Sequence, residues 1–241
     1  MRHVENGVMK MKKGIDAPLS LAGIIVGTIC AGIWAFDCRK WYAIIVFIFC
    51  AECAITFLHT TLIGKYKFAE KELKRWDIKA DDRLLDLGTG HGMLLVESAK
   101  YLKSPGKVTG IDIWKKDDQL NNSFSAALEN IERSGIRSVA DLVTADMLAM
   151  PFFDESFDGV MTSLSIHNIH QREDRKKALA EAWRVLKHGG KIMLIDLANA
   201  GEYQKTLFEL GFEEIVKRDA GYDGWWGVPW IRTTVITARK P

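Results

Sequence analysis

Three glycines on alternate positions close the segment 84–92, which reads Leu-Leu-Asp-Leu-Gly-Thr-Gly-His-Gly. Glycines after an apolar strand let backbone N–H groups and a helix N-terminus approach a ligand closely, as in nucleotide-binding clefts. Twenty residues beyond Gly92, Asp112 lies near the end of a second apolar run, residues 108–113. A carboxylate there can accept hydrogen bonds from both hydroxyls of a ribose. Glycine triplets also form ordinary tight turns, but the strand context and the spacing of Asp112 favour a nucleoside-binding cleft.

The spacing Asp-x-Gly-x-Gly-x-Gly differs from the Gly-x-Gly-x-x-Gly pattern of dinucleotide-binding proteins and resembles that of the class I S-adenosylmethionine-dependent methyltransferases. Three later segments are similar to the family in the same order. They are residues 143–151 (third strand and acidic turn), 157–161 (fourth strand), and 177–190 (helix and glycine turn before a fifth strand at 191–196). The resemblance covers residues 81–241, and its pattern is most similar to that of the small-molecule and quinone-type branch.

The resemblance implies an α/β fold, a Rossmann-like doubly wound sheet with an antiparallel last strand. It also implies that the domain binds S-adenosylmethionine and releases S-adenosylhomocysteine. Asp86 would hold the ammonium group directly or through water, because a charge at the end of a buried strand needs a partner. Asp146 and Met147 would flank the adenine, and a turn residue is the alternative for Asp146. The positions that match the family's cofactor site are Asp86, Gly88, Thr89, Gly90, Gly92, Asp112, Ile113, Asp146, Met147 and Ser163.

The segment after the fourth strand, residues 163–170, reads Ser-Leu-Ser-Ile-His-Asn-Ile-His. In the family, residues at this place touch the methyl group and the acceptor. The segment lacks the Asn/Asp-Pro-Pro-Tyr signature of many enzymes that methylate amide or nucleobase nitrogen. We therefore expect His167, or in reserve His170, to take a proton from a hydroxyl or ammonium acceptor, and Asn168 to contact the substrate. A helix N-terminal or hydrogen-bonding role is the alternative for each histidine.

An aromatic loop, residues 221–230, is expected to form a second wall of the site. The resemblance places this loop between a parallel sixth strand near residues 212–218 and an antiparallel seventh strand near residues 233–240, so that it emerges on the cofactor side. Its aromatic side chains suit either a lipid interface or an apolar or cationic acceptor, with packing against the sheet edge as the alternative. The predicted substrate-binding residues of this loop are Tyr222, Trp225, Trp226 and Trp230.

Two apolar runs, residues 17–36 and 41–63, precede this domain, and only four residues separate them. Each run is long enough to cross a bilayer core of about 30 Å as a helix, which predicts a transmembrane helical hairpin. The alternatives are a cleaved signal peptide for the first run and a pair of buried soluble helices. The chain would then have two spans within residues 1–64, a basic linker or amphipathic helix at 65–80, and a methyltransferase domain at 81–241.

Basic residues flank the outer ends of this hairpin, so the positive-inside rule predicts a two-pass membrane protein with both termini and the catalytic domain in the cytoplasm. Gly23 and Gly27 allow close helix packing, which we assign to the partner span, with a homo-oligomer as the alternative. Glu52 would bond to Thr28 across the hairpin, or contact a substrate or another subunit. The flanking residues are Lys10, Lys12, Lys13, Lys65, Lys67, Lys71, Lys74 and Arg75, against Arg39 and Lys40 in the turn.

The distribution of charged residues and of cysteines argues against several classes of function. Residues 1–76 hold eleven Lys and Arg against six Asp and Glu, and the remainder holds twenty-two against twenty-five. The slightly acidic domain is unsuited to tracking phosphates, so no nucleic-acid partner is expected. Cys50 and Cys53 lie in an apolar span and suit packing, and neither a disulfide framework nor a metal site is expected.

The sequence therefore predicts a membrane-anchored methyltransferase that acts from the cytoplasmic side on a small apolar or amphiphilic acceptor. A lipid, a quinone-like molecule or an amine would reach it from the lipid bilayer. A tethered methyltransferase for a soluble metabolite is one alternative. A non-catalytic module that senses the cofactor and regulates a membrane partner is the other.

Overall fold

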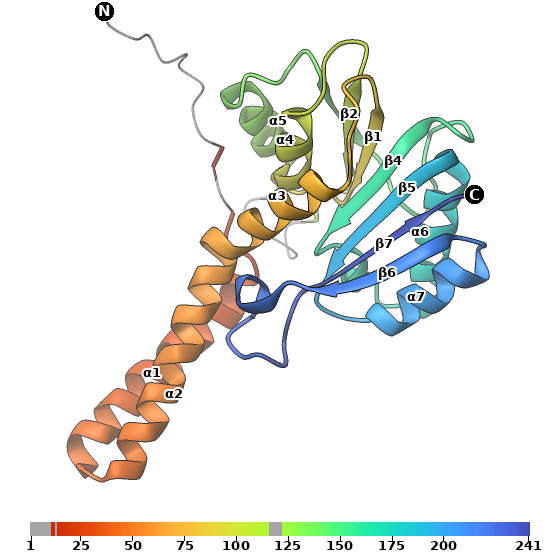
Figure 1. Cartoon of the computed structure of the whole chain (residues 1–241). Helices are drawn as coiled ribbons and strands as arrows, with labels where there is room; N and C mark the ends of the chain where they lie inside the picture. The colour runs from red at the N-terminus through yellow and green to blue at the C-terminus, as the bar shows by residue number, and fades with distance from the viewer. Residues whose placement is uncertain (1–10, 13, 116–121) are drawn as a thin grey trace, which may run out of the picture.

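The computed structural model describes residues 11–12, 14–115 and 122–241. A mixed sheet with helices on both faces forms one end of the molecule, and a long helical hairpin extends from it (Figure 1). Lys10 and Lys13, two of the basic residues that predict the orientation of the hairpin, lie outside the described residues.

Seven strands form the sheet in the order β3-β2-β1-β4-β5-β7-β6, and β7 runs antiparallel to both of its neighbours. This arrangement confirms the predicted Rossmann-like sheet with an antiparallel last strand. The strands are β1 (Arg83–Leu87), β2 (Lys107–Asp112), β3 (Ala140–Thr144), β4 (Phe157–Ser163), β5 (Leu186–Asp196), β6 (Glu213–Asp219) and β7 (Thr234–Arg239).

The central strands are apolar on both faces because helices cover both faces of the sheet. In β1, Leu84 packs under α3 (Lys65–Arg75), α4 (Met93–Ala99) and α5 (Phe124–Arg133), whereas Leu85 and Leu87 pack toward α6 (Arg172–Val185) and α7 (Ala200–Glu209). Asp86 shares the face of Leu84, because side chains alternate along a strand. The apolar run before the glycines is therefore a buried central strand, which ends beneath the glycine loop.

The start of β5 differs from the prediction. The strand was expected at residues 191–196 after a glycine turn, but it begins at Leu186 and includes Gly189 and Gly190. Its pairing shifts register between Phe157↔Leu186 and Gly159↔Lys191, and Gly189 has a φ of 77°. The glycines therefore form an irregularity within the strand, where a left-handed residue is accommodated without ending the pairing.

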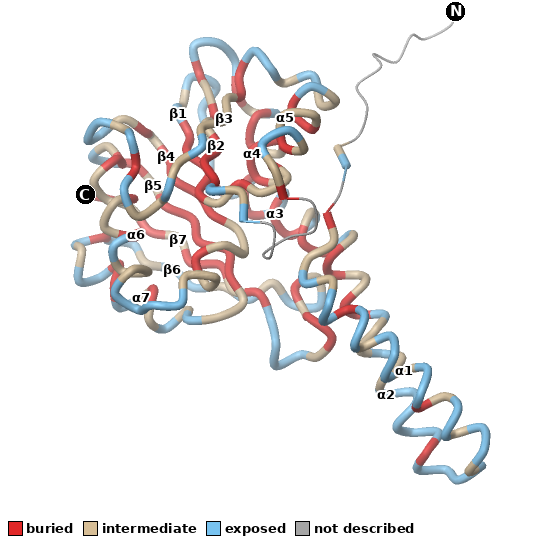
Figure 2. Tube along the Cα trace, turned by 180° about the vertical axis from the view of Figure 1, so that it is seen from behind, coloured by how far each residue is buried: buried red, intermediate tan, exposed pale blue. Residues whose placement is uncertain are grey.

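The hairpin consists of α1 (Pro18–Cys38) and α2 (Trp41–His59), and most of its surface is exposed (Figure 2). The second helix does not end at the domain. It continues through a π-helical turn, η1 (Thr60–Gly64), directly into α3, which gives one helix from Trp41 to Arg75. The two remaining short helices are the 3₁₀ turns η2 (Ile166–Asn168) and η3 (Gly221–Gly224).

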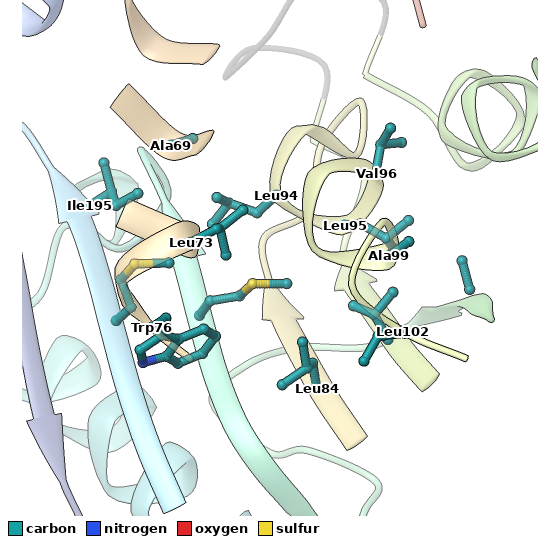
Figure 3. Close-up of a cluster of buried hydrophobic side chains, with 14 of the residues drawn as sticks. Ala69, Leu73, Trp76, Leu84, Leu94, Leu95, Val96, Ala99, Leu102 and Ile195 are labelled. Atoms are coloured by element: carbon teal, nitrogen blue, oxygen red, sulfur yellow. The ribbon is translucent and has the colours of Figure 1, made fainter. Parts of the chain in front are cut away.

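Of the two forms predicted for residues 65–80, a basic linker or an amphipathic helix, the structure has the helix over residues 65–75, and its apolar face supplies part of the core. Phe68, Ala69 and Leu73 are buried against the sheet together with Trp76, which follows the helix. Figure 3 shows Leu73 and Trp76 beside Leu84 of β1. The apolar residues recur at helical spacing, so one face of this otherwise charged helix is buried, whereas Lys67, Lys71 and Lys74 face outward.

Two expected contacts within the hairpin are not formed. No atom of a neighbouring element lies within 4 Å of a Cβ built on Gly23 or Gly27, so these glycines do not pack on the partner span. The Thr28 hydroxyl donates to the backbone oxygens of Ile24 (2.8 Å) and Cys50 (3.0 Å) rather than bonding to Glu52, which is exposed. Close packing in the hairpin occurs instead at Gly32, beside the ring of Phe47.

The aromatic loop packs against the base of the hairpin. The ring of Trp226 lies 5.4 Å from that of Phe57, and the Trp226 indole donates to Thr233 Oγ1 at 3.0 Å. Thr60 donates to the backbone oxygen of Trp225, and His59 Nε2 lies 2.8 Å from Asp223 Oδ1. The loop and the end of α2 therefore form one junction between hairpin and sheet.

Replacing Gly64 with alanine is expected to separate this junction. A Cβ at Gly64 would lie 2.1 Å from the backbone oxygen of Asp223, and backbone can yield only by moving the whole loop. We expect a cost of about 2 kcal/mol, which lowers the thermal midpoint by roughly 6 °C. Thermal unfolding in detergent measures the change.

The matched control is Gly201→Ala in α7, where nothing lies within 4 Å of the added Cβ. That change should leave the midpoint unchanged or raise it, because alanine is the better helix former. Equal midpoints for the two variants would show that the loop does not depend on this contact.

Candidate active site

A cavity of about 410 Å³ lies at the carboxyl ends of the parallel strands, which is where ligands bind in open α/β sheets. Its volume is within the range of small-molecule sites. Ten of the residues predicted for cofactor, acceptor or catalysis line it. They are Gly88, Thr89, Gly90, Asp112, Ile113, Asp146, Met147, Ser163, Asn168 and His170.

The glycine loop forms the floor of this cavity. Gly88, Gly90 and Gly92 all have positive φ values, of 64°, 51° and 84°. A Cβ on Gly88 would lie 2.3 Å from Ser165 Oγ, so both the backbone conformation and the available space require glycine there. Gly92 precedes the first turn of α4 and is not among the lining residues. The loop leaves its backbone open toward the cavity, as a cradle for a ligand must.

Asp112 holds the glycine loop and also faces the cavity. Its side chain is 9% exposed and accepts hydrogen bonds from the backbone N–H groups of Gly90 (2.9 Å) and Trp114 (2.6 Å). Asn122 Nδ2 is 3.5 Å from the same carboxylate, while Asn122 Oδ1 is buried and has no hydrogen-bond partner among the described residues. Carboxylate oxygens have lone pairs to spare, so both side chains can accept further hydrogen bonds from a ligand.

Asp86 lies beneath the floor and does not line the cavity. Its side chain is 2% exposed and accepts a hydrogen bond from the Thr89 hydroxyl at 2.7 Å. Burial raises the pKa of the Asp86 carboxyl to about 7, although hydrogen bonds from Thr89 and from the Leu95 backbone oppose that rise. The direct contact with a cofactor that the family implies would therefore have to pass through the floor, which leaves the water-mediated or electrostatic form of the prediction.

The structure separates the two candidate histidines. His170 lines the cavity. His167 does not, because its Nδ1 lies 2.5 Å from Asp196 Oδ1 and its backbone N–H donates to Asp196 Oδ2 at 3.1 Å. Asp196 also accepts hydrogen bonds from the Leu197 backbone (2.8 Å) and the Tyr203 hydroxyl (3.2 Å). His167 is thus fixed to the end of β5, and the hydrogen-bonding alternative describes its position better than direct contact with an acceptor.

The aromatic loop is placed differently from the prediction. Tyr222, Trp225, Trp226 and Trp230 are not among the residues that line the cavity. Trp226 is buried at the junction with the hairpin, whereas Trp230 is largely exposed. The loop does follow a strand end on the cofactor side, but the hairpin base occupies the space beside it, so it forms no wall of this cavity.

Residues that precede the sheet form the wall that the aromatic loop was expected to supply. Met11, Asp16, Lys65 and Tyr66 all line the cavity. The backbone of Lys12 is held by the Asn130 side chain, which accepts from its N–H at 2.7 Å and donates to its carbonyl at 3.1 Å. No pattern in the sequence indicated this wall, because its members come from separate segments that tertiary packing brings together.

Comparison with known proteins identifies the fold of this part of the chain. Residues 85–194 match the family model described as "Methyltransferase domain". This part of the chain is a class I S-adenosylmethionine-dependent methyltransferase domain. The methyltransferase domain includes the glycine loop, Asp112 and the segment 163–170, which contribute eleven of the residues that line the cavity.

Curated relatives of the domain are similar to it over about half of the chain. A demethylmenaquinone methyltransferase of Roseiflexus castenholzii is 36% identical over 116 residues, which are 48% of this chain and 43% of the relative. The ubiquinone/menaquinone biosynthesis C-methyltransferase UbiE of Cronobacter sakazakii is 31% identical over 132 residues, 55% of this chain and 47% of the relative. The chain thus spans about half the length of the curated relatives that it matches.

Solved structures share the fold at low sequence identity. A geranyl diphosphate methyltransferase in complex with S-adenosylmethionine has a TM-score of 0.58 and 16% identity, and the match covers 73% of this chain and 85% of that one. The [4+2]-cyclase SpnF also has a TM-score of 0.58, with 20% identity and coverage of 73% and 81%. Proteins with different reactions in their names therefore share this fold. The fold alone does not determine the reaction, which depends on the residues of the site.

The described residues of the cavity fit S-adenosylmethionine. The glycine loop lines the cavity with backbone, and Gly88 has no space for a side chain because a Cβ there would collide with Ser165. The side-chain oxygens of Asn122 and Ser163 are buried and have no hydrogen-bond partner within the part of the chain that the structure describes, so a ligand could provide one. Asp112 offers an acceptor for ribose hydroxyls, and the carboxyl of Asp86 lies below the loop. These groups would hold a nucleoside with a cationic tail.

Proposed function

We propose that the chain is a membrane-anchored methyltransferase that transfers a methyl group from S-adenosylmethionine to an apolar or amphiphilic acceptor, with a quinone-like ring as the first candidate. The observation that carries the proposal is the composition of the cavity wall. One side is the glycine loop with Asp112, and the other side comes from Asp16, Lys65 and Tyr66, at the base of the hairpin. A cofactor site and a membrane-proximal entrance would then belong to the same cavity.

The cofactor, when bound, supplies an electrophilic methyl group on a sulfonium. In the proposed complex the backbone of residues 88–92 supports it, Asp112 accepts hydrogen bonds from the ribose, and Asp146 and Met147 flank the adenine. Asn122 would add an acceptor beside the ribose. Met11, which lines the cavity, would keep water from the reacting groups, since Asn130 holds the backbone of the adjacent Lys12.

His170 is the group that we propose to accept a proton from the acceptor. It is exposed and lines the cavity together with Asn168, which would contact the acceptor. His167 would act through position: its bond to Asp196 ties the turn that carries both residues to the end of β5. Alignment of the acceptor with the methyl group would supply the rest of the catalysis.

Membrane attachment rests on the two helices of the hairpin. Both are long and apolar enough to span a bilayer, and both are mostly exposed, whereas a core helix of a soluble protein is mostly buried. Lys67, Lys71, Lys74 and Arg75 follow the second helix and support a cytoplasmic domain under the positive-inside rule. Gly23 and Gly27 are four residues apart and have open space beside them, so we propose that they pack against a second subunit.

The relatives support the choice of acceptor, because they are named for demethylmenaquinone and for ubiquinone or menaquinone biosynthesis. The neighbouring apolar surface supports it as well. Leu164 and Ile169 line the cavity, and Leu164 packs against the cluster of Leu21, Phe57 and Trp226 at the hairpin base. A long apolar substituent of an acceptor could therefore extend from the cavity toward the bilayer.

The test uses the full chain in liposomes with S-adenosylmethionine labelled in its methyl group. Parallel reactions contain a demethylated hydroquinone, a lipid amine or a water-soluble catechol. We expect label in the extracted hydroquinone and equimolar S-adenosylhomocysteine. Transfer only to the catechol would favour the tethered enzyme for a soluble metabolite. Cofactor binding without transfer to any of the three acceptors would favour the sensing module.

Affinity for S-adenosylhomocysteine should rise with pH because Asp86 titrates near neutrality. Its pKa of about 7 leaves it mostly protonated at pH 6 and mostly ionised at pH 8, and the ionised form attracts the ammonium group of the ligand. The expected gain in affinity is about tenfold over this interval, which calorimetry at each pH measures.

The folding stability of the free protein depends on pH in the opposite direction. The free protein should lose stability as the pH rises from about 4 to 7, because folding raises this pKa.

Asp86→Asn, which cannot ionise, is the control for this experiment. Its affinity should change little between pH 6 and pH 8. The same tenfold change in that variant would assign the pH dependence to another group.

A further inference from the structure

Lys65 is a buried cation in the wall of the cavity. Its side chain is 8% exposed, although lysine is among the residues that are rarely buried. It was grouped with the basic residues that flank the hairpin, but it lies at the first position of α3 and faces the cavity together with Tyr66. The other lysine of the described lining, Lys115, is exposed. Lys65 is therefore the buried positive charge of this lining.

The position of Lys65 is fixed by Asp16. The Lys65 ammonium donates to Asp16 Oδ2, which also accepts from the Thr61 hydroxyl at 2.9 Å. Thr61 Oγ1 in turn accepts from the Asp16 backbone N–H at 3.1 Å. Thr61 and Lys65 are four residues apart, on one side of the continuous helix, so both face the segment that precedes α1.

The ammonium has hydrogen-bonding capacity to spare. It carries three N–H donors, and among the described residues Asp16 is its one hydrogen-bond partner. The face of the Tyr66 ring, 5.3 Å from Nζ, provides a further favourable contact. Burying an ammonium that is only partly satisfied is costly, which a ligand with an anionic oxygen would offset.

We propose that Lys65 binds an anionic oxygen of a ligand in the cavity, with Asp16 and Thr61 as the residues that position it. This proposal rests on the proposed function, because it assumes that cofactor and acceptor occupy the cavity. Two ligand groups have the required chemistry. One is the carboxylate of the methionine part of the cofactor, since α3 packs beside α4 and Lys65 lines the same cavity as the glycine loop. The other is the oxyanion of a deprotonated hydroxyl on the acceptor.

The experiment compares Lys65→Met with the parent in two measurements on the full chain in detergent. Calorimetry gives the affinities for S-adenosylhomocysteine and for its decarboxylated analogue, and a transfer assay gives kcat/KM for a hydroquinone acceptor. If the cofactor carboxylate is the partner, Lys65→Met should weaken S-adenosylhomocysteine about tenfold or more and leave the analogue unchanged. If the acceptor oxyanion is the partner, cofactor affinity should stay the same and kcat/KM should fall by a similar factor.

Matched variants separate charge from structure. Lys67→Met lies on the same helix at an exposed position and should match the parent in both measurements. Lys65→Arg keeps the charge and should retain most of the parent's affinity or kcat/KM. The double variant with Asp16→Asn and Lys65→Met leaves no unpaired carboxylate at this half-buried position, so it measures the loss of affinity or kcat/KM even if the single variant folds poorly.

The proposal is overturned if the folded single or double variant matches the parent in both the affinity for S-adenosylhomocysteine and kcat/KM. This failure is distinct from failure of the proposed function, because parent protein that neither binds S-adenosylhomocysteine nor transfers a methyl group would refute the function before any variant is compared.

Discussion

Replacing Asp112 with alanine is expected to weaken the binding of S-adenosylhomocysteine about 100-fold or more, close to 3 kcal/mol. The carboxylate serves two purposes, and the variant loses both. It would accept the ribose hydroxyls, and it fixes the glycine loop through its bond to the Gly90 backbone at 2.9 Å. The ligand would therefore lose a charged hydrogen-bond acceptor, and its binding would also have to order a glycine loop that is more mobile without Asp112.

Calorimetry on the full chain in detergent measures this loss, and the thermal midpoint shows whether the variant is folded. Asp141→Ala, on neighbouring strand β3, removes an exposed carboxylate paired with Lys107 and should bind as the parent does. A folded Asp112→Ala variant with parental affinity would remove Asp112 from the cofactor site.

Asp196→Ala should cause the largest loss of stability. This buried carboxylate accepts hydrogen bonds from the backbones of His167 and Leu197 and from the Tyr203 hydroxyl, and it lies against the His167 ring. Removing the acceptor leaves several donors unsatisfied at the end of β5, each at a cost of about 1–3 kcal/mol. Allowing for partial rescue by water, we expect a total of about 3 kcal/mol, which lowers the thermal midpoint by roughly 6–12 °C.

Two controls accompany this variant. Tyr203→Phe removes one of the donors together with its bond and should cost only about 1 kcal/mol. Asp154→Ala removes an exposed partner of Arg184 and should cost less than that. If Asp196→Ala unfolds within 2 °C of the parent, water or a rearranged turn replaces the carboxylate, and His167 is not held as the structure indicates.

The central part of the site could be predicted because its residue types follow from local backbone requirements. Gly88 needs a positive φ and has no space for a Cβ, and Asp112 lies at the end of a strand one crossover later. These constraints act over a few residues and leave a fixed spacing in the sequence. The doubly wound sheet with its antiparallel last strand was expected from the resemblance of these segments to the methyltransferase family, and the structure has that arrangement.

The remaining wall could not be predicted, because it depends on contacts between distant segments. Asp16 meets Thr61 and Lys65 only after the chain has passed through the hairpin. His167 looked equivalent to His170 in the sequence, but His167 lies in the short turn η2 and bonds to Asp196, whereas His170 lies after that turn and lines the cavity. Trp226 was expected beside the acceptor, whereas the base of the hairpin provides its apolar partner, Phe57.

The uninterrupted helix from Trp41 to Arg75 has a mechanical consequence for the proposed membrane enzyme. Its 35 residues extend for about 52 Å, well beyond a bilayer core of about 30 Å. Because α3 is also part of the core of the domain, the helix would connect the membrane to the domain rigidly rather than as a flexible linker. The cavity would keep a constant height and tilt above the headgroups, and encounters would depend on diffusion in the plane of the membrane. The acceptor's density per unit area, rather than its bulk concentration, would then govern the rate.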